Sequence, residues 1–175
     1  MKKKQNERIN YIVPFLFLIY LVLLVWIVLF KLQFSISEID AIRQINLIPF
    51  HYDNEIRIEL HLKEVLENVA IFIPFGIYLS MLSDARYLKA MVFLISVVSL
   101  VLEVVQYILA IGQTDITDLL TNTCGGALGI FLYWLSKKIF RSKRHADLVL
   151  TIMAAIVTIV VGGMLIILLI ANGGR

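Results

Sequence analysis

The 175-residue sequence contains a single cysteine and lacks the short motifs that mark several common enzyme classes. One cysteine, Cys124, excludes a disulfide within the chain, and no cysteine cluster indicates zinc. The sequence has no G-x-S-x-G, no H-E-x-x-H and no Walker-type glycine loop. We also find no internal repeat with a period of about 20 to 50 residues. These absences leave the enzyme question open and exclude a disulfide scaffold.

Charge is scarce and apolar side chains are abundant, with 17% charged and 60% hydrophobic residues. A soluble domain of this size does not need so many apolar residues. Since a membrane span takes about 20 residues, five runs qualify, three of them continuous and two interrupted: residues 12–30, 64–82, 88–111, 115–140 and 148–171. We therefore predict an all-α, polytopic membrane helical bundle with five transmembrane helices, forming a single membrane domain over residues 1–175.

A strongly apolar stretch lies near each end of the chain. The stretch 11–30 has an apolar core longer than the usual signal-peptide core of about 7 to 15 residues. We therefore expect an anchor helix here rather than a removed leader. The stretch 147–171 is expected to form a C-terminal transmembrane helix.

Basic residues are unevenly distributed between the predicted loops. Eleven lie on one side of the spans and five on the other; the first group is Lys2, Lys3, Lys4, Arg8, Arg86, Lys89, Lys137, Lys138, Arg141, Lys143 and Arg144, and the second is Lys31, Arg43, Arg57, Lys63 and Arg175. The positive-inside rule then predicts an N-terminus in the cytoplasm and a C-terminus outside. The basic clusters favour contact with anionic membrane lipids, and nothing beside them indicates nucleic acid.

Polar residues interrupt three of the predicted spans. Their helical spacing gives each helix one polar face, and the predicted topology places all of them in the outer half of the membrane: Asn68, then Glu103 and Gln106, then Asp115, Asp118 and Asn122. A charged side chain at membrane depth faces the bundle interior or a wet cavity, because exposure to acyl chains is costly. We therefore expect a polar, acidic cavity that is open to the outside.

The candidate catalytic residues in this cavity are Glu103, Asp115 and Asp118. Neighbouring carboxylates repel one another, so one of them tends to hold a proton, which suits general acid–base work. The same oxygens also suit a divalent cation such as Mg²⁺ or Ca²⁺. The spacing does not choose between these roles, and the cofactor stays unassigned.

Simpler roles fit several of the same residues. Asp115 could cap the following helix, and Gln106 and Asn122 could join helices through hydrogen bonds. Glu103 has no basic residue in its own span or the next, so its ionised form needs water, a cation or a partner from the outer loop; the candidate partners are Arg43, Arg57 and Lys63. A metal site at His51 and His61 of that loop is a further alternative.

Glycines and the outer loops complete the sequence pattern. Gly125 and Gly129 form a G-x-x-x-G pair, which predicts close packing against another helix. Residues 31–63 form a long outer loop whose apolar piece INLIPF lies either in the membrane interface or against the bundle. The following residues have apolar positions at helical spacing and predict an amphipathic lead-in to the second span. The stretch IGQTD, 111–115, is expected to be a short outer turn.

Four segments together resemble the motif set of the VanZ-like family: NLIPF (46–50), ENVAIFIPFG (67–76), LEVVQ (102–106) and DITDLLTNTCGGALG (115–129). The resemblance covers about residues 44–135. It adds Gly126 to the candidate ligand-binding residues, which then are Asn68, Gln106, Asn122 and Gly126. Many members carry an arginine just before the first aspartate, where this sequence has Gly112, Gln113 and Thr114.

The resemblance implies a multi-pass protein of the bacterial plasma membrane that contributes to lipoglycopeptide resistance, typified by teicoplanin. On this hypothesis the outer cavity binds an amphiphilic envelope ligand or the lipoglycopeptide. One alternative is a membrane enzyme that acts on an envelope lipid or precursor through the carboxylates. Another is a non-catalytic partner that organises other membrane proteins. The sequence does not assign the ligand, the metal or the oligomeric state.

Overall fold

The computed structural model describes residues 2–30, 42–50 and 55–172. Within them it contains five long helices, two short strands and one 3-10 turn: α1 (Lys2–Phe30), β1 (Ile42–Asn46), α2 (Glu55–Leu82), η2 (Ala85–Tyr87), α3 (Leu88–Leu109), β2 (Ile111–Asp115), α4 (Ile116–Phe140) and α5 (Lys143–Asn172). The mainly helical architecture predicted from the sequence is therefore confirmed. Each predicted span corresponds to one helix, and α2 begins at Glu55, so the residues expected to lead into the second span are helical.

Four of these helices are long and apolar enough to cross a membrane, in the described stretches Tyr11–Leu29, His61–Leu82, Ala85–Leu109 and Lys143–Met164. α4 is long enough but less apolar, because its first half carries Asp118, Asn122 and several threonines and glycines. The predicted count of five transmembrane helices is thus supported for four of them. The fifth span and the membrane topology stay predictions.

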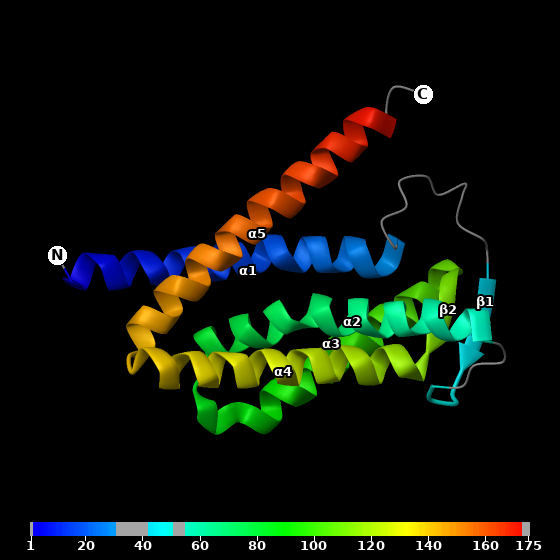
Figure 1. Cartoon of the computed structure of the whole chain (residues 1–175), viewed down its shortest axis with the longest axis horizontal. Helices are drawn as coiled ribbons and strands as arrows, with labels where there is room; N and C mark the ends of the chain where they lie inside the picture. The colour runs from blue at the N-terminus through cyan, green and yellow to red at the C-terminus, as the bar shows by residue number, and fades with distance from the viewer. Residues whose placement is uncertain (1, 31–41, 51–54, 173–175) are drawn as a thin grey trace.

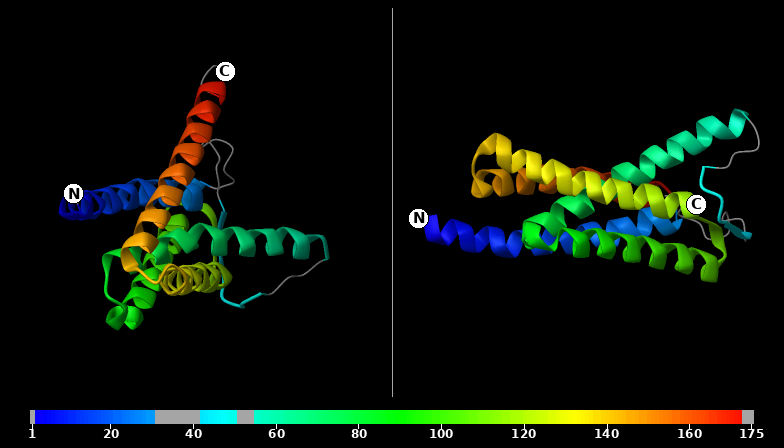
Figure 2. Two further views of the ribbon diagram at one scale, coloured as in Figure 1. Left: turned by 60° about the vertical axis from the view of Figure 1, so that its left-hand side comes forward. Right: turned by 90° about the horizontal axis from the view of Figure 1, so that it is seen from below.

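The two ends of the helix bundle carry different segments of the chain (Figure 1, Figure 2). α1, α2, α3 and α4 run along the long axis of the molecule, whereas α5 crosses them obliquely and extends away at its C-terminal end. The N-terminus, η2 and the junction of α4 and α5 lie at one end, and β1 and β2 lie at the other. Eleven basic residues are predicted from the sequence to lie on one side. The segments that carry them, 2–8, 86–89 and 137–144, lie at the first end.

α2 and α4 pack with their backbones in direct contact. A Cβ atom added to Gly76 of α2 would overlap the carbonyl oxygen of Gly126, and one added to Gly129 of α4 would overlap the carbonyl oxygen of Ile73. Gly125 meets the backbone of Val69 in the same way. The close helix contact predicted from the G-x-x-x-G pair is therefore confirmed, and it fixes α2 beside α4 along most of their length.

α1 covers the apolar side of this helix pair. Phe72 and Phe75 of α2 are fully buried in one cluster with Leu24 of α1 and Ile95 of α3. The hydroxyl of Tyr20 crosses the same interface and donates to the carbonyl oxygen of Ile71 at 2.8 Å. These contacts hold α1, α2 and α3 against one another.

β1 and β2 form a parallel pair in which Asn46 lies opposite Asp115. The expected short connection over 111–115 joins α3 to α4, but its residues form a strand rather than a turn. Its partner β1 lies two helices earlier in the chain, and a parallel pairing always needs such a crossover. A strand this short gives no local signal for a partner so far away, so only the folded bundle reveals the pairing.

Candidate functional site

The C-terminal half of α3 has one polar face that points into the bundle. Ser99, Glu103 and Gln106 lie at spacings of four and three, so they share this face, and Glu103 and Gln106 are each only 2% exposed. The opposite face carries exposed apolar residues such as Val104 and Ile108. α3 therefore turns its polar side chains inward and its apolar ones outward, as a membrane helix with a functional or packing face does.

The start of α4 supplies the second set of polar groups. Asp115 is the N-cap residue, and its Oδ1 accepts a hydrogen bond from the backbone N–H of Thr117 at 2.7 Å. One turn later, Asp118 is half-buried, and Asn122 is only 1% exposed. The cap fixes where α4 begins and so determines which residues of α4 face α3.

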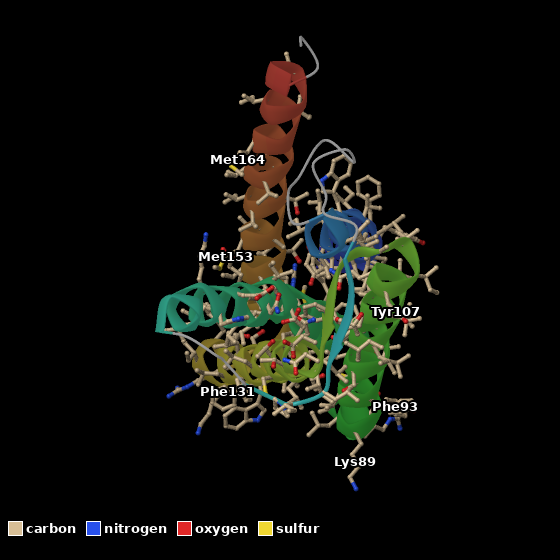
Figure 3. All side chains as sticks on the ribbon, turned by 90° about the vertical axis from the view of Figure 1, so that its right-hand side faces the viewer. Lys89, Phe93, Tyr107, Phe131, Met153 and Met164 are labelled. Atoms are coloured by element: carbon tan, nitrogen blue, oxygen red, sulfur yellow. The ribbon has the colours of Figure 1, made fainter. Side chains whose placement is uncertain are left out.

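A cavity of about 450 Å³ lies between these helices. Its lining combines polar residues of α2, α3 and α4 with apolar residues of α1, α2 and α5: Lys63, Glu64, Glu67, Asn68, Glu103, Gln106, Asp118 and Asn122, together with Ile27, Val28, Ile71, Val161 and Met164. Figure 3 views the molecule from the end that carries β1 and β2, and it shows oxygen and nitrogen atoms gathered among α2, α4 and β2 while Phe93 and Tyr107 point outward from α3.

Hydrogen bonds around the cavity join four helices, α1, α2, α3 and α4. Asn68 of α2 donates from Nδ2 to Asp118 Oδ1 at 2.7 Å, and Asn122 Nδ2 donates to the hydroxyl oxygen of Ser99 on α3 at 2.9 Å. Gln106 Nε2 donates to the carbonyl oxygen of Val28 on α1 at 2.8 Å. The polar residues of the sequence motifs thus hold the walls of the cavity together as well as lining it.

Glu103 links the cavity to the strand pair. Its Oε2 accepts a hydrogen bond from the backbone N–H of Asp115 at 3.1 Å, and its carbonyl oxygen accepts one from the Thr114 hydroxyl at 3.1 Å. Asp115 in turn accepts from Asn46 Nδ2 at 3.0 Å. A buried carboxylate that binds a backbone N–H in this way is fixed in position relative to the end of β2.

The structure separates the predicted site residues into two groups. Asn68, Glu103, Gln106, Asp118 and Asn122 line one cavity. The other two predicted residues do not line it: Asp115 caps α4 and binds Asn46, and Gly126 packs against Ile95 in a helix contact. The capping role considered for Asp115 is therefore confirmed, and a catalytic or ligand-binding role for any of these residues stays a prediction.

The predicted partners of Glu103 are placed only in part. Lys63 lines the cavity, but its Nζ lies 3.7 Å from Glu67 Oε1 and its side chain is 73% exposed, so it lies at the rim. The side chains of Arg43 and Arg57 lie outside the described part of the structure. Pairing of Glu103 with either arginine therefore stays a prediction.

The described side chains do not form a set of ligands for a metal ion. No group of three histidine, cysteine, aspartate or glutamate residues is close enough to hold one ion among the side chains that the structure describes. The Nδ1 atom of His61 lies 3.5 Å from Oε2 of Glu64, and His51 lies outside the described residues. The divalent cation considered from the sequence stays a prediction.

Sequence reasoning misses some residues of the site. Ser99 does not line the cavity but accepts the hydrogen bond from Asn122, and it precedes Glu103 by four residues on the same helix face, a spacing that could have identified it. Glu64 and Glu67 at the rim belong to the predicted lead-in to the second span, and their acidic pattern could have suggested a charged entrance. Val28, Val161 and Met164 give no signal, because an apolar residue in an apolar helix is indistinguishable from its neighbours.

The apolar segment after β1 contacts the beginning of α4. Phe50 donates its backbone N–H to the Thr117 hydroxyl at 3.1 Å, and Ile48 donates to Asn46 Oδ1 at 3.1 Å. The side chains of Leu47, Ile48 and Phe50 are nevertheless exposed. The backbone of the segment therefore contacts the bundle at the start of α4, and its apolar side chains point outward.

Removing the cap of α4 is expected to destabilise this end of the molecule. Asp115→Ala should lower the free energy of unfolding by about 1 to 2 kcal/mol, because it removes the N-cap hydrogen bond and the contact with Asn46. The measurement is thermal unfolding of the purified protein in detergent. Asp115→Asn is the matched control: its side-chain oxygen can still cap α4 but its amide nitrogen cannot accept from Asn46, so it should unfold between the wild-type protein and the alanine variant. Equal stability of the alanine variant would contradict the capping role.

Comparison with known proteins relates these motifs to one family. The VanZ/LLP1 family matches residues 17–141, a stretch that begins in α1 and ends just after α4. Protein VanZ of Enterococcus faecium is 44% identical over 129 residues, which cover 72% of this chain and 76% of that protein. No solved structure matches the chain. The family match contains every residue that the sequence analysis singles out for the site.

Proposed function

Because this chain belongs to the VanZ/LLP1 family, we propose that it is a multi-pass protein of the bacterial plasma membrane that lowers susceptibility to teicoplanin. The polar cavity is its ligand site, and the ligand is an amphiphile of the cell envelope or the lipoglycopeptide itself. The association with teicoplanin comes from the family resemblance. The structural observation that supports a ligand-binding role is the polar cavity.

The composition of the cavity wall supports an amphiphilic ligand. Carboxylates and amides from α2, α3 and α4 form one part of the wall, and Ile27, Val161 and Met164 from α1 and α5 form another. Small-molecule sites typically combine an apolar wall with a few converging polar groups that fix orientation. A lipid whose polar headgroup contacts Glu103 and Asp118 and whose acyl chain lies along α1 and α5 would contact both parts of the cavity wall.

The membrane topology of the proposal has all five helices as spans, with the N-terminus in the cytoplasm and the C-terminus outside. The segments rich in lysine and arginine lie at one end of the molecule. This supports the proposed topology, because loops with many lysines and arginines favour the cytoplasmic side. The proposal includes α4 as a span because the polar residues of its first half hydrogen-bond to α2 and α3, which is compatible with a helix in the membrane. The cavity then lies in the outer half of the membrane.

Cysteine labelling tests this topology. In a background with Cys124→Ala, a membrane-impermeant maleimide should label Ile48→Cys in intact cells and label Asp84→Cys only after lysis. Both positions are exposed and lie at opposite ends of the helices, so their difference in labelling reports the orientation. Labelling of Asp84→Cys in intact cells would reverse the topology and place the cavity on the cytoplasmic side.

Teicoplanin susceptibility of cells that express the chain tests the function. A susceptible Gram-positive host carrying the intact chain should tolerate more teicoplanin than the same host with an empty vector. The effect should depend on the cavity residues and not on the amount of protein in the membrane, which is followed by immunoblotting of membrane fractions. Unchanged susceptibility with normal membrane levels would refute the resistance role.

A second candidate function is catalysis on an envelope lipid or its precursor. Glu103 and Asp118 line the same cavity, and two carboxylates in one site can serve as general acid and general base. Purified protein should then turn over a polyprenyl phosphate or a lipid-linked precursor, and Glu103→Gln should abolish that activity while leaving ligand binding. An inert preparation that still binds its ligand would favour the binding function.

A further inference from the structure

Two buried amide oxygens beside the cavity have no hydrogen-bond donor. Gln106 and Asn122 are 2% and 1% exposed, and among the described residues no group donates to Gln106 Oε1 or Asn122 Oδ1. Their amide nitrogens are already used, by the Val28 carbonyl oxygen and the Ser99 hydroxyl oxygen. A buried acceptor without a donor is costly, so two of them on the wall of one cavity indicate that a ligand or water supplies the donors.

The charges around these oxygens are predominantly negative. The lining contains four carboxylates, those of Glu64, Glu67, Glu103 and Asp118, and one ammonium group, that of Lys63. Lys63 lies beside Glu67 at the rim, with a 73% exposed side chain, so its charge is not in the depth of the cavity. Carbonyl and carboxylate oxygens together favour a group that brings positive charge and N–H donors, and they disfavour a bare phosphate or sulfate.

We propose that the cavity binds a primary ammonium group, with Gln106 Oε1 and Asn122 Oδ1 accepting its N–H hydrogen bonds near Glu103 and Asp118. This inference rests on the proposed function, because it takes the same cavity as the ligand site and identifies the headgroup that enters it. A primary ammonium group has three N–H donors and one positive charge, which matches two neutral acceptors beside carboxylates. A divalent cation fits less well, since three or more acidic or histidine ligands do not come together in the described chain.

The apolar part of the lining points to the source of the ammonium group. Ile27, Val161 and Met164 belong to the same cavity, and Met164 and its neighbours on α5 are largely exposed to the surroundings of the bundle. A lipid such as phosphatidylethanolamine carries its ammonium group on an acyl-chain anchor and can place the chains against these residues. A water-soluble amine offers the same ammonium chemistry without the apolar contacts, so the two sources can be distinguished by experiment.

Competitive lipid binding to the purified full-length protein tests the inference. Native mass spectrometry in detergent compares phosphatidylethanolamine with phosphatidylcholine of identical acyl chains, whose headgroup nitrogens carry three N–H donors and three methyl groups, respectively. We expect phosphatidylethanolamine to bind about tenfold more tightly, which corresponds to about 1.4 kcal/mol. Glycerophosphoethanolamine, which lacks acyl chains, should compete weakly if the source is a lipid and as well as the lipid if the source is a soluble amine.

Substitutions of Gln106 and Asn122 test whether these two residues cause the preference for phosphatidylethanolamine. Gln106→Met and Asn122→Leu should each remove most of the preference for phosphatidylethanolamine, whereas Thr123→Val should keep it. Thr123 lies next to Asn122 but hydrogen-bonds to Ser96 at 3.2 Å and does not line the cavity, so it is the matched control. If the amide variants do not fold, the lipid comparison with the unmodified protein decides alone.

Equal binding of the two lipids by the unmodified protein would overturn the inference and leave water as the donor to both oxygens. That result would not affect the resistance role, which is measured by teicoplanin susceptibility in cells. Conversely, a clear preference for phosphatidylethanolamine with unchanged teicoplanin susceptibility would support the ammonium site and refute the proposed resistance. The two failures are therefore distinguishable.

Discussion

Gly129→Leu is expected to abolish accumulation of folded protein in the membrane. The added side chain would overlap the carbonyl oxygen of Ile73, and neither helix can yield without breaking the contact between α2 and α4. Because the obstacle is backbone rather than a flexible side chain, we expect a loss of stability of at least about 3 kcal/mol, at the upper end of the range for overpacking. Gly76→Leu, on the opposite helix of the same contact, should have the same effect.

The chain contains its own control for this experiment. Gly162 and Gly163 of α5 have open space around the position of an added Cβ atom, so Gly162→Leu and Gly163→Leu should leave the protein folded. The measurement is the fraction of monodisperse protein recovered after size-exclusion chromatography in detergent, followed by thermal unfolding. Normal recovery of Gly129→Leu would show that α2 and α4 do not pack through their glycines.

Glu103→Gln and Asp118→Asn are each expected to return cells to the teicoplanin susceptibility of the empty-vector strain. Both changes keep an oxygen that can accept the existing hydrogen bonds from Asp115 N–H and Asn68 Nδ2, and both remove the negative charge. A charge-assisted hydrogen bond to the ligand contributes about 1.5 to 3 kcal/mol, so binding should weaken about 10- to 100-fold. The minimum inhibitory concentration of teicoplanin is the measurement, with membrane levels checked for each variant.

These conservative changes also distinguish the binding function from a purely structural one. If the polar residues only join helices, glutamine and asparagine should serve as well as the acids, and resistance should persist. Asp84→Asn is the control for loss of an acidic side chain, because Asp84 is at the opposite end of the molecule and pairs only with Arg86 among the contacts described for it. Glu103→Ala and Asp118→Ala should lose resistance and still reach the membrane. Full resistance in all four cavity variants would remove the cavity from the explanation.

Most of the site could be predicted from spacing along individual helices. Glu103 and Gln106 are three residues apart on α3, and Asp118 and Asn122 are four residues apart on α4, so each pair had to share a helix face. Burial of these faces followed from the cost of placing charge and amides in hydrocarbon. The roles of Asp115 and Gly126 could not be separated from the others in this way, because capping and helix contact depend on the neighbours of a residue and not on its position in a stripe.

The sequence by itself determined the helical class, the location of the long helices and the polar faces of α3 and α4, because these depend on periodicities within single segments. Only the tertiary structure decided that β1 pairs with β2, that α1 and α5 complete the cavity, and that the nitrogens of Gln106 and Asn122 are used while their oxygens are not. Each of these features joins segments far apart in the chain. Their partners are selected by packing in three dimensions, which leaves no pattern within either segment.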